Sequence, residues 1–208
     1  MADRLIDRTL RAFSDDLSAD SPVPGGGSAA AYAGAMGAAL AAMVSRIAAK
    51  KSQAPALATF AAEMDELRAE LLRLVDDDSA AYARVAAAMK LPRTTDEQKA
   101  ERQAQLQETL VAASRVPLRV AKTARRLLEA CERGLETASP MTASDIGVGA
   151  LLAETALRGA ALNVMINLSS VKDPAEVKAL SEDLDRTIDG SDDQLRRITD
   201  VVESRIAR

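Results

Sequence analysis

An acidic cluster, Asp76-Asp77-Asp78, interrupts a segment with helical apolar spacing. Asp77 has Arg73 and Arg84 as helical neighbours, as expected of a solvated flank. A carboxylate on an apolar face is costly unless it is paired or used, so we predict that Asp78 is a catalytic acid or base. A structural acid bonded to a buried partner is the alternative. The positions that share a face with Asp78 are Leu71, Leu74, Val75, Ala81, Tyr82 and Val85.

A glycine-rich turn, Pro22-Val23-Pro24-Gly25-Gly26-Gly27-Ser28, leads into a long uncharged segment. Glycines at a helix N-terminus expose backbone N–H groups, which suit an anionic or carbonyl-bearing ligand. The turn lacks the lysine of a phosphate-binding loop, and no predicted strand precedes it. Close helix packing is the alternative explanation of the glycines. The candidate binding residues are Pro24, Gly25, Gly26, Gly27 and Ser28.

Two further groups of polar residues fall on one predicted helix. Ser144 is expected to be its N-cap, with Asp145 in the first turn, which by itself is an ordinary helix start. Asn163 and Asn167 share a face with Gly159 among apolar neighbours, so their amides need partners. They either bridge helices or bind the edge of a heterocycle, because an amide both donates and accepts hydrogen bonds.

The composition excludes several kinds of chemistry and of partner. Histidine is absent, which removes Ser-His-Asp and Cys-His catalysis and the usual zinc sites, so no metal is expected. The single cysteine, Cys131, allows no intrachain disulfide and is typical of a reducing cytoplasm. The net charge is −4, with basic and acidic residues interleaved, so nucleic acid is not an expected partner.

The elements that must position these residues all have helical patterns. Hydrophobic residues make up 48% of the chain but aromatic residues only 2%, a composition that favours helices over strands. We predict one domain over residues 1–208, an all-α bundle without a dividing linker. The start of the chain lacks a signal-peptide pattern. The helices are expected at about 5–17, 28–48, 54–89, 95–134, 144–170, after Asp173-Pro174, and after Ser191.

Several local features of these helices can be checked against the structure. Capping boxes are predicted at Thr95 to Gln98 and at Ser191 to Gln194. Pro117 is expected to kink or break its helix. The uncharged segment Pro22 to Ser45 is interpreted as a buried central helix and not as a membrane span. A small-residue stripe within it indicates close helix contact at the centre of the protein or at a subunit interface: Ala30, Gly34, Ala38 and Ala42.

Five blocks of the chain resemble, in order and spacing, the cyclodeaminase/cyclohydrolase family, that is, the formiminotransferase-cyclodeaminase C-terminal domain and its free-standing bacterial relatives. The resemblance covers nearly the whole chain. It implies an all-α homodimer of long antiparallel helices, with folate bound in a cleft close to the subunit interface. The blocks are Pro24 to Ser28, Asp78 with Ala81-Tyr82, Val116-Pro117, Ser144-Asp145, and Asn163 to Leu168.

The resemblance also implies an activity on tetrahydrofolate derivatives as substrates, with no tightly bound cofactor. The family hydrolyses 5,10-methenyltetrahydrofolate to 10-formyltetrahydrofolate, or releases ammonia from 5-formiminotetrahydrofolate. The formiminotransferase domain is missing here, which favours the cyclohydrolase. A cyclodeaminase and a non-catalytic folate-binding helical dimer are the alternatives. A small-molecule folate is the expected ligand, and neither a membrane nor nucleic acid is expected.

The roles of individual residues follow as hypotheses. Asp78 would activate water or relay a proton, while Asp145 would orient the pterin or pair with the cationic carbon. Lys50 and Lys51 would hold the glutamate tail, a solvated helix end being the alternative. The glycine turn, Tyr82 and the two asparagines would shape the pterin pocket. This chain departs from the family pattern at Arg46, Ala48, Ala138, Ser139 and Met141, which leaves the precise substrate open.

Overall fold

The computed structural model describes residues 4–207, and its regular structure over that range is entirely helical, as predicted. A 3-10 turn at Leu5–Asp7 and the short helix α1 (Leu10–Leu17) precede six longer helices. These are α2 (Gly26–Ser52), α3 (Pro55–Met89), α4 (Asp96–Gly134), α5 (Ala143–Leu168), α6 (Pro174–Ile188) and α7 (Ser191–Ile206).

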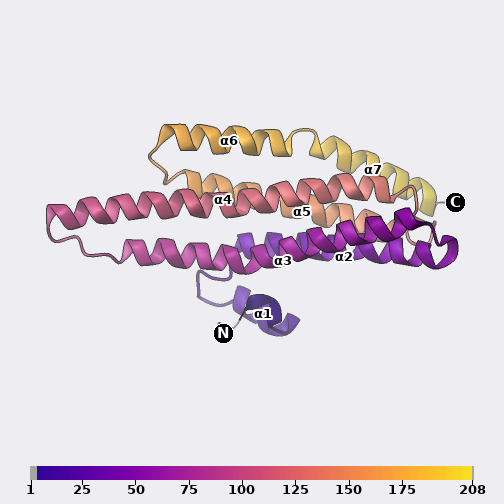
Figure 1. Ribbon diagram of the computed structural model, residues 1–208, viewed down its shortest axis with the longest axis horizontal. Helices are drawn as coiled ribbons and strands as arrows, with labels where there is room; N and C mark the ends of the chain where they lie inside the picture. Colours follow the sequence, from indigo (N-terminus) through magenta and orange to yellow (C-terminus); the bar gives the residue numbers. More distant parts are fainter. Residues whose placement is uncertain (1–3, 208) are drawn as a thin grey trace.

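Helices α2 to α5 pack together as the centre of the bundle, and α6 and α7 lie against α4 and α5. Figure 1 shows α3 and α4 side by side, with α2 and α5 behind them, and the α3–α4 hairpin extending beyond the other helices. Helix α1 projects from this body and is joined to it by a tilted ring contact between Phe13 and Tyr32. The polar candidates on α2, α3 and α5 are therefore carried by rigid, mutually packed helices.

The small-residue stripe of α2 lies inside the chain, where it allows α2 and α5 to run antiparallel at close range. A Cβ added at Gly34 would lie 3.1 Å from the Cβ of Ala156, and one added at Gly37 would lie 2.7 Å from the Gly149 carbonyl oxygen. Larger side chains would force the two backbones apart. Ala30, Gly34, Ala38 and Ala42 are all buried within the chain, so the stripe lies at the centre of the protein. The alternative prediction, a subunit interface, is wrong for these four positions.

The two predicted capping boxes have different outcomes. The Thr95 side chain accepts the N–H of Gln98 and the Gln98 side chain accepts the N–H of Thr95, which confirms the box at the start of α4. The box at Ser191 is wrong, because Gly190 is the N-cap of α7. The Ser191 hydroxyl donates instead to the buried carboxylate of Glu154 on α5, so a tertiary partner replaces the local one.

Other predicted helix boundaries shift by a few residues. The N-cap of α2 is Gly25, which places Ser28 inside the first turn. The N-cap of α5 is Thr142, so the prediction of Ser144 as the cap is wrong and Ser144 lies within the helix. Helix α4 does not break at Pro117 but continues through it to its end. Asp173 does cap α6, with its carboxylate accepting two backbone N–H groups.

Two segments, Gly26–Ser52 and Pro140–Leu168, are long and apolar enough to cross a membrane by length and composition alone. Inside the bundle 61% of the apolar window in the first and 50% of that in the second is buried. Both helices contribute to the hydrophobic core, through residues such as Ala31, Ala38, Val44, Ala153 and Leu157. The prediction of a buried central helix after the glycine turn is confirmed.

Candidate functional site

The carboxylate of Asp78 lies against the first turn of α2, fifty residues away in the sequence. Its Oδ2 accepts a hydrogen bond from the Ser28 hydroxyl at 3.0 Å, and the backbone N–H of Ser28 also donates to the carboxylate. A Cβ at Gly27 would lie 2.6 Å from Cγ and 2.8 Å from Oδ2 of Asp78. A glycine is therefore required at position 27, because the carboxylate fills the space that any side chain there would use.

Two opposing effects set the pKa of Asp78. Burial disfavours the ionised form and is the larger effect, while the hydrogen bonds from the side chain and backbone of Ser28 favour it. The pKa of Asp78 is therefore raised above its ordinary value. A carboxylate with a raised pKa is a stronger base than an ordinary one, so its ionised form accepts a proton more readily.

Asp78 opens onto a cavity of about 380 Å³ between the start of α2, the middle of α3 and the end of α5. The predicted residues Gly25, Gly26 and Gly27 line one side of it, and Tyr82 lines the α3 side. The structure thus brings together candidates from three of the five sequence blocks. The remaining lining is largely apolar and includes Ala81, Val85, Met89, Leu110 and Ile166.

Asn163 and Asn167 form the α5 wall of this cavity. The Nδ2 group of Asn163 donates to the Gly159 carbonyl of its own helix at 2.9 Å. That of Asn167 donates to the Ala113 carbonyl on α4 at 3.1 Å, so this amide does bridge two helices. Each amide retains its oxygen and one N–H for a ligand.

Two predicted binding residues lie outside the cavity, and Asp77 is on the expected solvated flank but pairs with a residue of another helix. Ser28 is fully buried and bonds Asp78, so it supports the carboxylate and does not face the cavity. Pro24 is buried and lines an adjacent hollow on the α1 side of the turn. Asp77 is about half exposed, and its ion pair, at 3.6 Å, is with Arg119 on α4 and not with the helical neighbours of its own helix.

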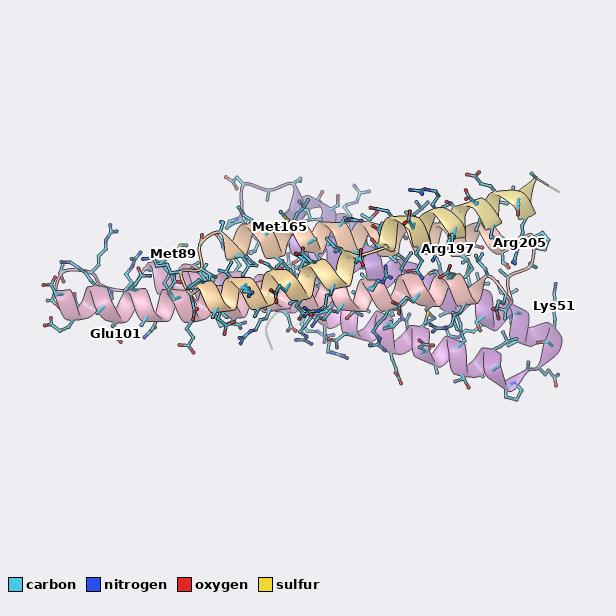
Figure 2. The ribbon with its side chains drawn as sticks, turned by 90° about the horizontal axis from the view of Figure 1, so that it is seen from above. Lys51, Met89, Glu101, Met165, Arg197 and Arg205 are labelled. Atoms are coloured by element: carbon cyan, nitrogen blue, oxygen red, sulfur yellow. The ribbon has the colours of Figure 1, made fainter. Side chains whose placement is uncertain are left out.

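Ser144, Asp145, Lys50 and Lys51 do not lie at this cavity within one chain. Asp145 is in the first turn of α5, and the 18 residues from there to Asn163 correspond to about 27 Å along a helix axis. Lys50 and Lys51 are in the last turn of α2, whose first turn meets Asp78. Figure 2 shows Lys51 at one end of the bundle and Met89, which lines the Asp78 cavity, towards the other.

A second cavity, of about 440 Å³, lies at the Lys51 end between α2, α3 and the loop that precedes α5. Three positions at which this chain departs from the family pattern line it: Ala48, Ala138 and Ser139. Met141 is in the same loop with its side chain almost fully exposed. Within one chain these departures therefore lie at the far end of the bundle, and none of them lines the Asp78 cavity.

Sequence reasoning missed several residues of the cavity. Met89 follows Asp78 by eleven positions, so helical spacing, which did place Val85 on the face of Asp78, could have placed Met89 there too. Outside the cavity lining, the Ser79 hydroxyl lies 3.3 Å from that of Ser28, which in turn bonds Asp78. Nothing in the local sequence indicates this contact, because it joins α2 to α3.

The chain that builds this cavity is similar in sequence to known enzymes. Residues 9–186 match the formiminotransferase-cyclodeaminase family. The chain is 36% identical over 202 residues to a methenyltetrahydrofolate cyclohydrolase of Methylorubrum extorquens, an alignment that covers 95% of this chain and 97% of that protein. It is 38% identical over 173 residues to the formimidoyltransferase-cyclodeaminase of Rattus norvegicus, covering 81% of this chain and 32% of that longer protein.

A solved structure supports the same relationship. The crystal structure of formiminotetrahydrofolate cyclodeaminase from Thermotoga maritima superimposes with a TM-score of 0.84 at 27% sequence identity, over 95% of this chain and 96% of that one. The match therefore includes the helices that carry Asp78, the glycine turn and the two asparagines. On the family match and the full-length identity together, this chain belongs to the formiminotransferase-cyclodeaminase family.

Proposed function

We propose that this protein is a methenyltetrahydrofolate cyclohydrolase, which hydrolyses 5,10-methenyltetrahydrofolate to 10-formyltetrahydrofolate in the cytoplasm. The Methylorubrum protein of that name aligns with this chain over nearly the whole of both proteins. The observation that carries the proposal is Asp78, a carboxyl of raised pKa in a cavity whose other polar side chains include two amides and a phenol. The substrate is a folate, and no tightly bound cofactor is part of the proposal.

The proposed reaction adds water to the electron-poor carbon between N5 and N10 and breaks its bond to N5. Ionised Asp78 takes a proton from the attacking water as the C–O bond forms, and its charge stabilises the cationic substrate. It passes that proton to N5 as the C–N5 bond breaks. The second water proton leaves to solvent as the formyl carbonyl forms. A raised pKa suits Asp78 to both transfers.

The direct test is to add purified protein to 5,10-methenyltetrahydrofolate and follow the loss of its near-ultraviolet band. The proposal predicts decay faster than in buffer, with 10-formyltetrahydrofolate as the product. Decay no faster than in buffer would reject the cyclohydrolase. Asp78→Asn protein of the same purity controls for a contaminating hydrolase, since it has the same expected fold.

A cyclodeaminase is the second candidate, because the structurally similar Thermotoga protein is a formiminotetrahydrofolate cyclodeaminase. It would act on 5-formiminotetrahydrofolate and release ammonia, with the same carboxylate moving a proton to the leaving nitrogen. Ammonia release from the formimino compound, together with the absence of methenyl hydrolysis, would select this activity. A helical dimer that binds folate without turnover would show neither reaction.

A homodimer is also part of the proposal, and the surface of α2 and α5 supports it. These two helices are in contact, and each carries large apolar side chains that are exposed to solvent. In Figure 1 both helices lie behind α3 and α4. An exposed apolar patch of this kind is typical of an interface. Its exposed residues are Met36, Met43, Ile47, Val148, Leu151, Leu162 and Ile166.

A two-fold dimer through this face can bring together candidate site residues that lie far apart within one chain. If the partner helices run antiparallel, the first turn of α5 in one copy lies opposite the end of α5 in the other. Asp145 and Lys51 of the second copy then approach the Asp78 cavity of the first. This arrangement accounts for catalytic and tail-binding candidates that lie at opposite ends of a single chain.

Subunit mixing tests the shared site. Asp78→Asn and Asp145→Asn proteins are each expected to be inactive alone. After unfolding and refolding together, half of the subunits enter mixed dimers, in which one of the two sites is intact, so about a quarter of wild-type activity should return. Mixtures with no more activity than the separate variants would reject a site built from two copies.

A further inference from the structure

Pro117 leaves one backbone carbonyl of α4 without its usual partner. Proline has no N–H, so the Ala113 carbonyl, four residues earlier, lacks its intrahelical donor. Helix α4 nevertheless continues through this point, and the vacancy is filled from another helix. The Nδ2 group of Asn167 on α5 donates to the Ala113 oxygen at 3.1 Å.

This bond determines which atoms Asn167 can offer to a ligand. The Ala113 oxygen and the amide oxygen of Asn167 are both acceptors, so the amide nitrogen of Asn167 must be the group that faces Ala113. Both Asn167 and Ala113 line the Asp78 cavity. With one N–H committed, the amide oxygen and the second N–H remain for the cavity. If the Ala113 carbonyl were bonded within its own helix, the Asn167 amide could flip, and its nitrogen would then lie where its oxygen lies now.

The neighbouring amide has the same orientation. The Nδ2 of Asn163 donates to the Gly159 carbonyl, so its oxygen is also left for a ligand. With the Asp78 carboxylate, the polar side of the cavity then presents a set of oxygen acceptors. Such a set fits a ligand edge rich in N–H donors, for which an amino-substituted heterocycle that also carries a ring N–H is the matching chemistry.

We propose that Pro117 is a positioning residue for the substrate: by freeing the Ala113 carbonyl it fixes the amide of Asn167 with its oxygen available to the N–H edge of the pterin. The inference rests on the proposed folate site and adds a specificity determinant to it. Pro117 itself does not line the cavity. Pro117 affects substrate binding only through Asn167. Replacing Asn167 therefore distinguishes this role of Pro117 from a purely structural one.

Restoring the N–H at position 117 tests this directly. In Pro117→Ala the new N–H can close the helix onto Ala113, and removal of an interior proline favours the helix. The melting temperature should therefore stay the same or rise. The KM for 5,10-methenyltetrahydrofolate should rise about three- to tenfold, as expected for the loss of one hydrogen bond, and kcat should change little. Pro174→Ala is the matched control, because Pro174 is at the first position of α6 and deprives no carbonyl of a partner.

A double-mutant cycle decides whether Pro117 acts through Asn167. The KM of Pro117→Ala/Asn167→Ala should equal that of Asn167→Ala alone, because the amide that Pro117 orients is gone. Additive effects, or a Pro117→Ala enzyme with unchanged KM, would overturn the proposal. The Asn167 side-chain NH₂ signals, assigned by their loss in Asn167→Ala, should also shift in Pro117→Ala protein without ligand.

The same cycle can be run on binding, which separates this inference from the proposed reaction. The probe is 5-formyltetrahydrofolate, with the Kd measured by calorimetry. If wild-type protein binds 5-formyltetrahydrofolate but does not hydrolyse the methenyl compound, the proposed cyclohydrolase activity is rejected. The Kd values of the wild-type, single-variant and double-variant proteins then still decide the role of Pro117. If wild-type protein binds no folate, the inference is rejected together with the site.

Discussion

Asp78→Asn is the change that best separates catalysis from structure at this site. Asparagine has the shape of aspartate, so it fits beside Gly27, where no larger group has room. Its oxygen can still accept the backbone N–H of Ser28. The Ser28 hydroxyl, which lies 3.0 Å from Oδ2 and 2.9 Å from the Val75 carbonyl, can donate to Val75 and accept from the new NH₂ group. No hydrogen bond need be lost.

The stability change of this variant is a small difference between two effects. Loss of a negative charge at the N-terminus of α2 removes about 0.3–1 kcal/mol of favourable interaction with the helix dipole. Burial raises the pKa of Asp78, so its ionisation destabilises the fold; this contribution is fully present above the folded-state pKa and disappears as pH falls from there to below the unfolded-state pKa. Asparagine removes this cost. We expect the free energy of unfolding to change by less than about 1 kcal/mol at neutral pH.

Turnover should respond very differently. Without the basic oxygen, kcat for methenyltetrahydrofolate should fall about 10²–10⁴-fold. In the wild-type enzyme, activity should decline towards acid at a pH above the usual range for aspartate, because the pKa of Asp78 is raised and only the ionised form acts as the base. The residual activity of Asp78→Asn should lack this decline.

Asp77→Asn provides the matched control one position away. Asp77 is about half exposed and pairs with Arg119 at 3.6 Å, so its loss should cost less than about 1 kcal/mol and leave kcat unchanged. Melting temperature and kcat are measured for both variants. An Asp78→Asn enzyme that is fully active but markedly less stable would refute the catalytic assignment and leave Asp78 as a cap for α2.

Three further outcomes follow from the geometry. Gly27→Ala should displace the Asp78 carboxylate and lower kcat by about 10²-fold, whereas Gly25→Ala, whose added Cβ has 3.4 Å of clearance, should not; steady-state kinetics on the pair checks this. Gly34→Leu should lower the free energy of unfolding by about 1–3 kcal/mol, since its Cβ alone already meets two side chains at 3.1 Å; denaturant unfolding that matches wild type would contradict the packing. Lys51→Met should raise KM with little change in kcat if the lysine holds the glutamate tail, and an unchanged KM would remove it from the site.

Helical periodicity in the sequence was sufficient to predict the fold class and several of the residues that line the candidate cavity. The apolar spacing around Asp78 placed it on an inward face, and it does line a cavity with Ala81 and Tyr82. The capping box at Thr95 and the cap at Asp173 were also predicted, because both depend on contacts within four residues. Such features are local, and a local pattern is enough to specify them.

The partners of these residues were decided only by the tertiary structure. Periodicity gives the face on which a side chain lies, but not the helix that it meets or the position along the bundle at which they meet. The carboxylate of Asp78 meets the first turn of α2, Asn167 fills the vacancy left by Pro117, and Ser191 bonds Glu154 in place of its own helix end. In each case the partner lies on another helix, and the packing of the helices brings the two groups together, so a tertiary hydrogen bond forms that no local pattern specifies.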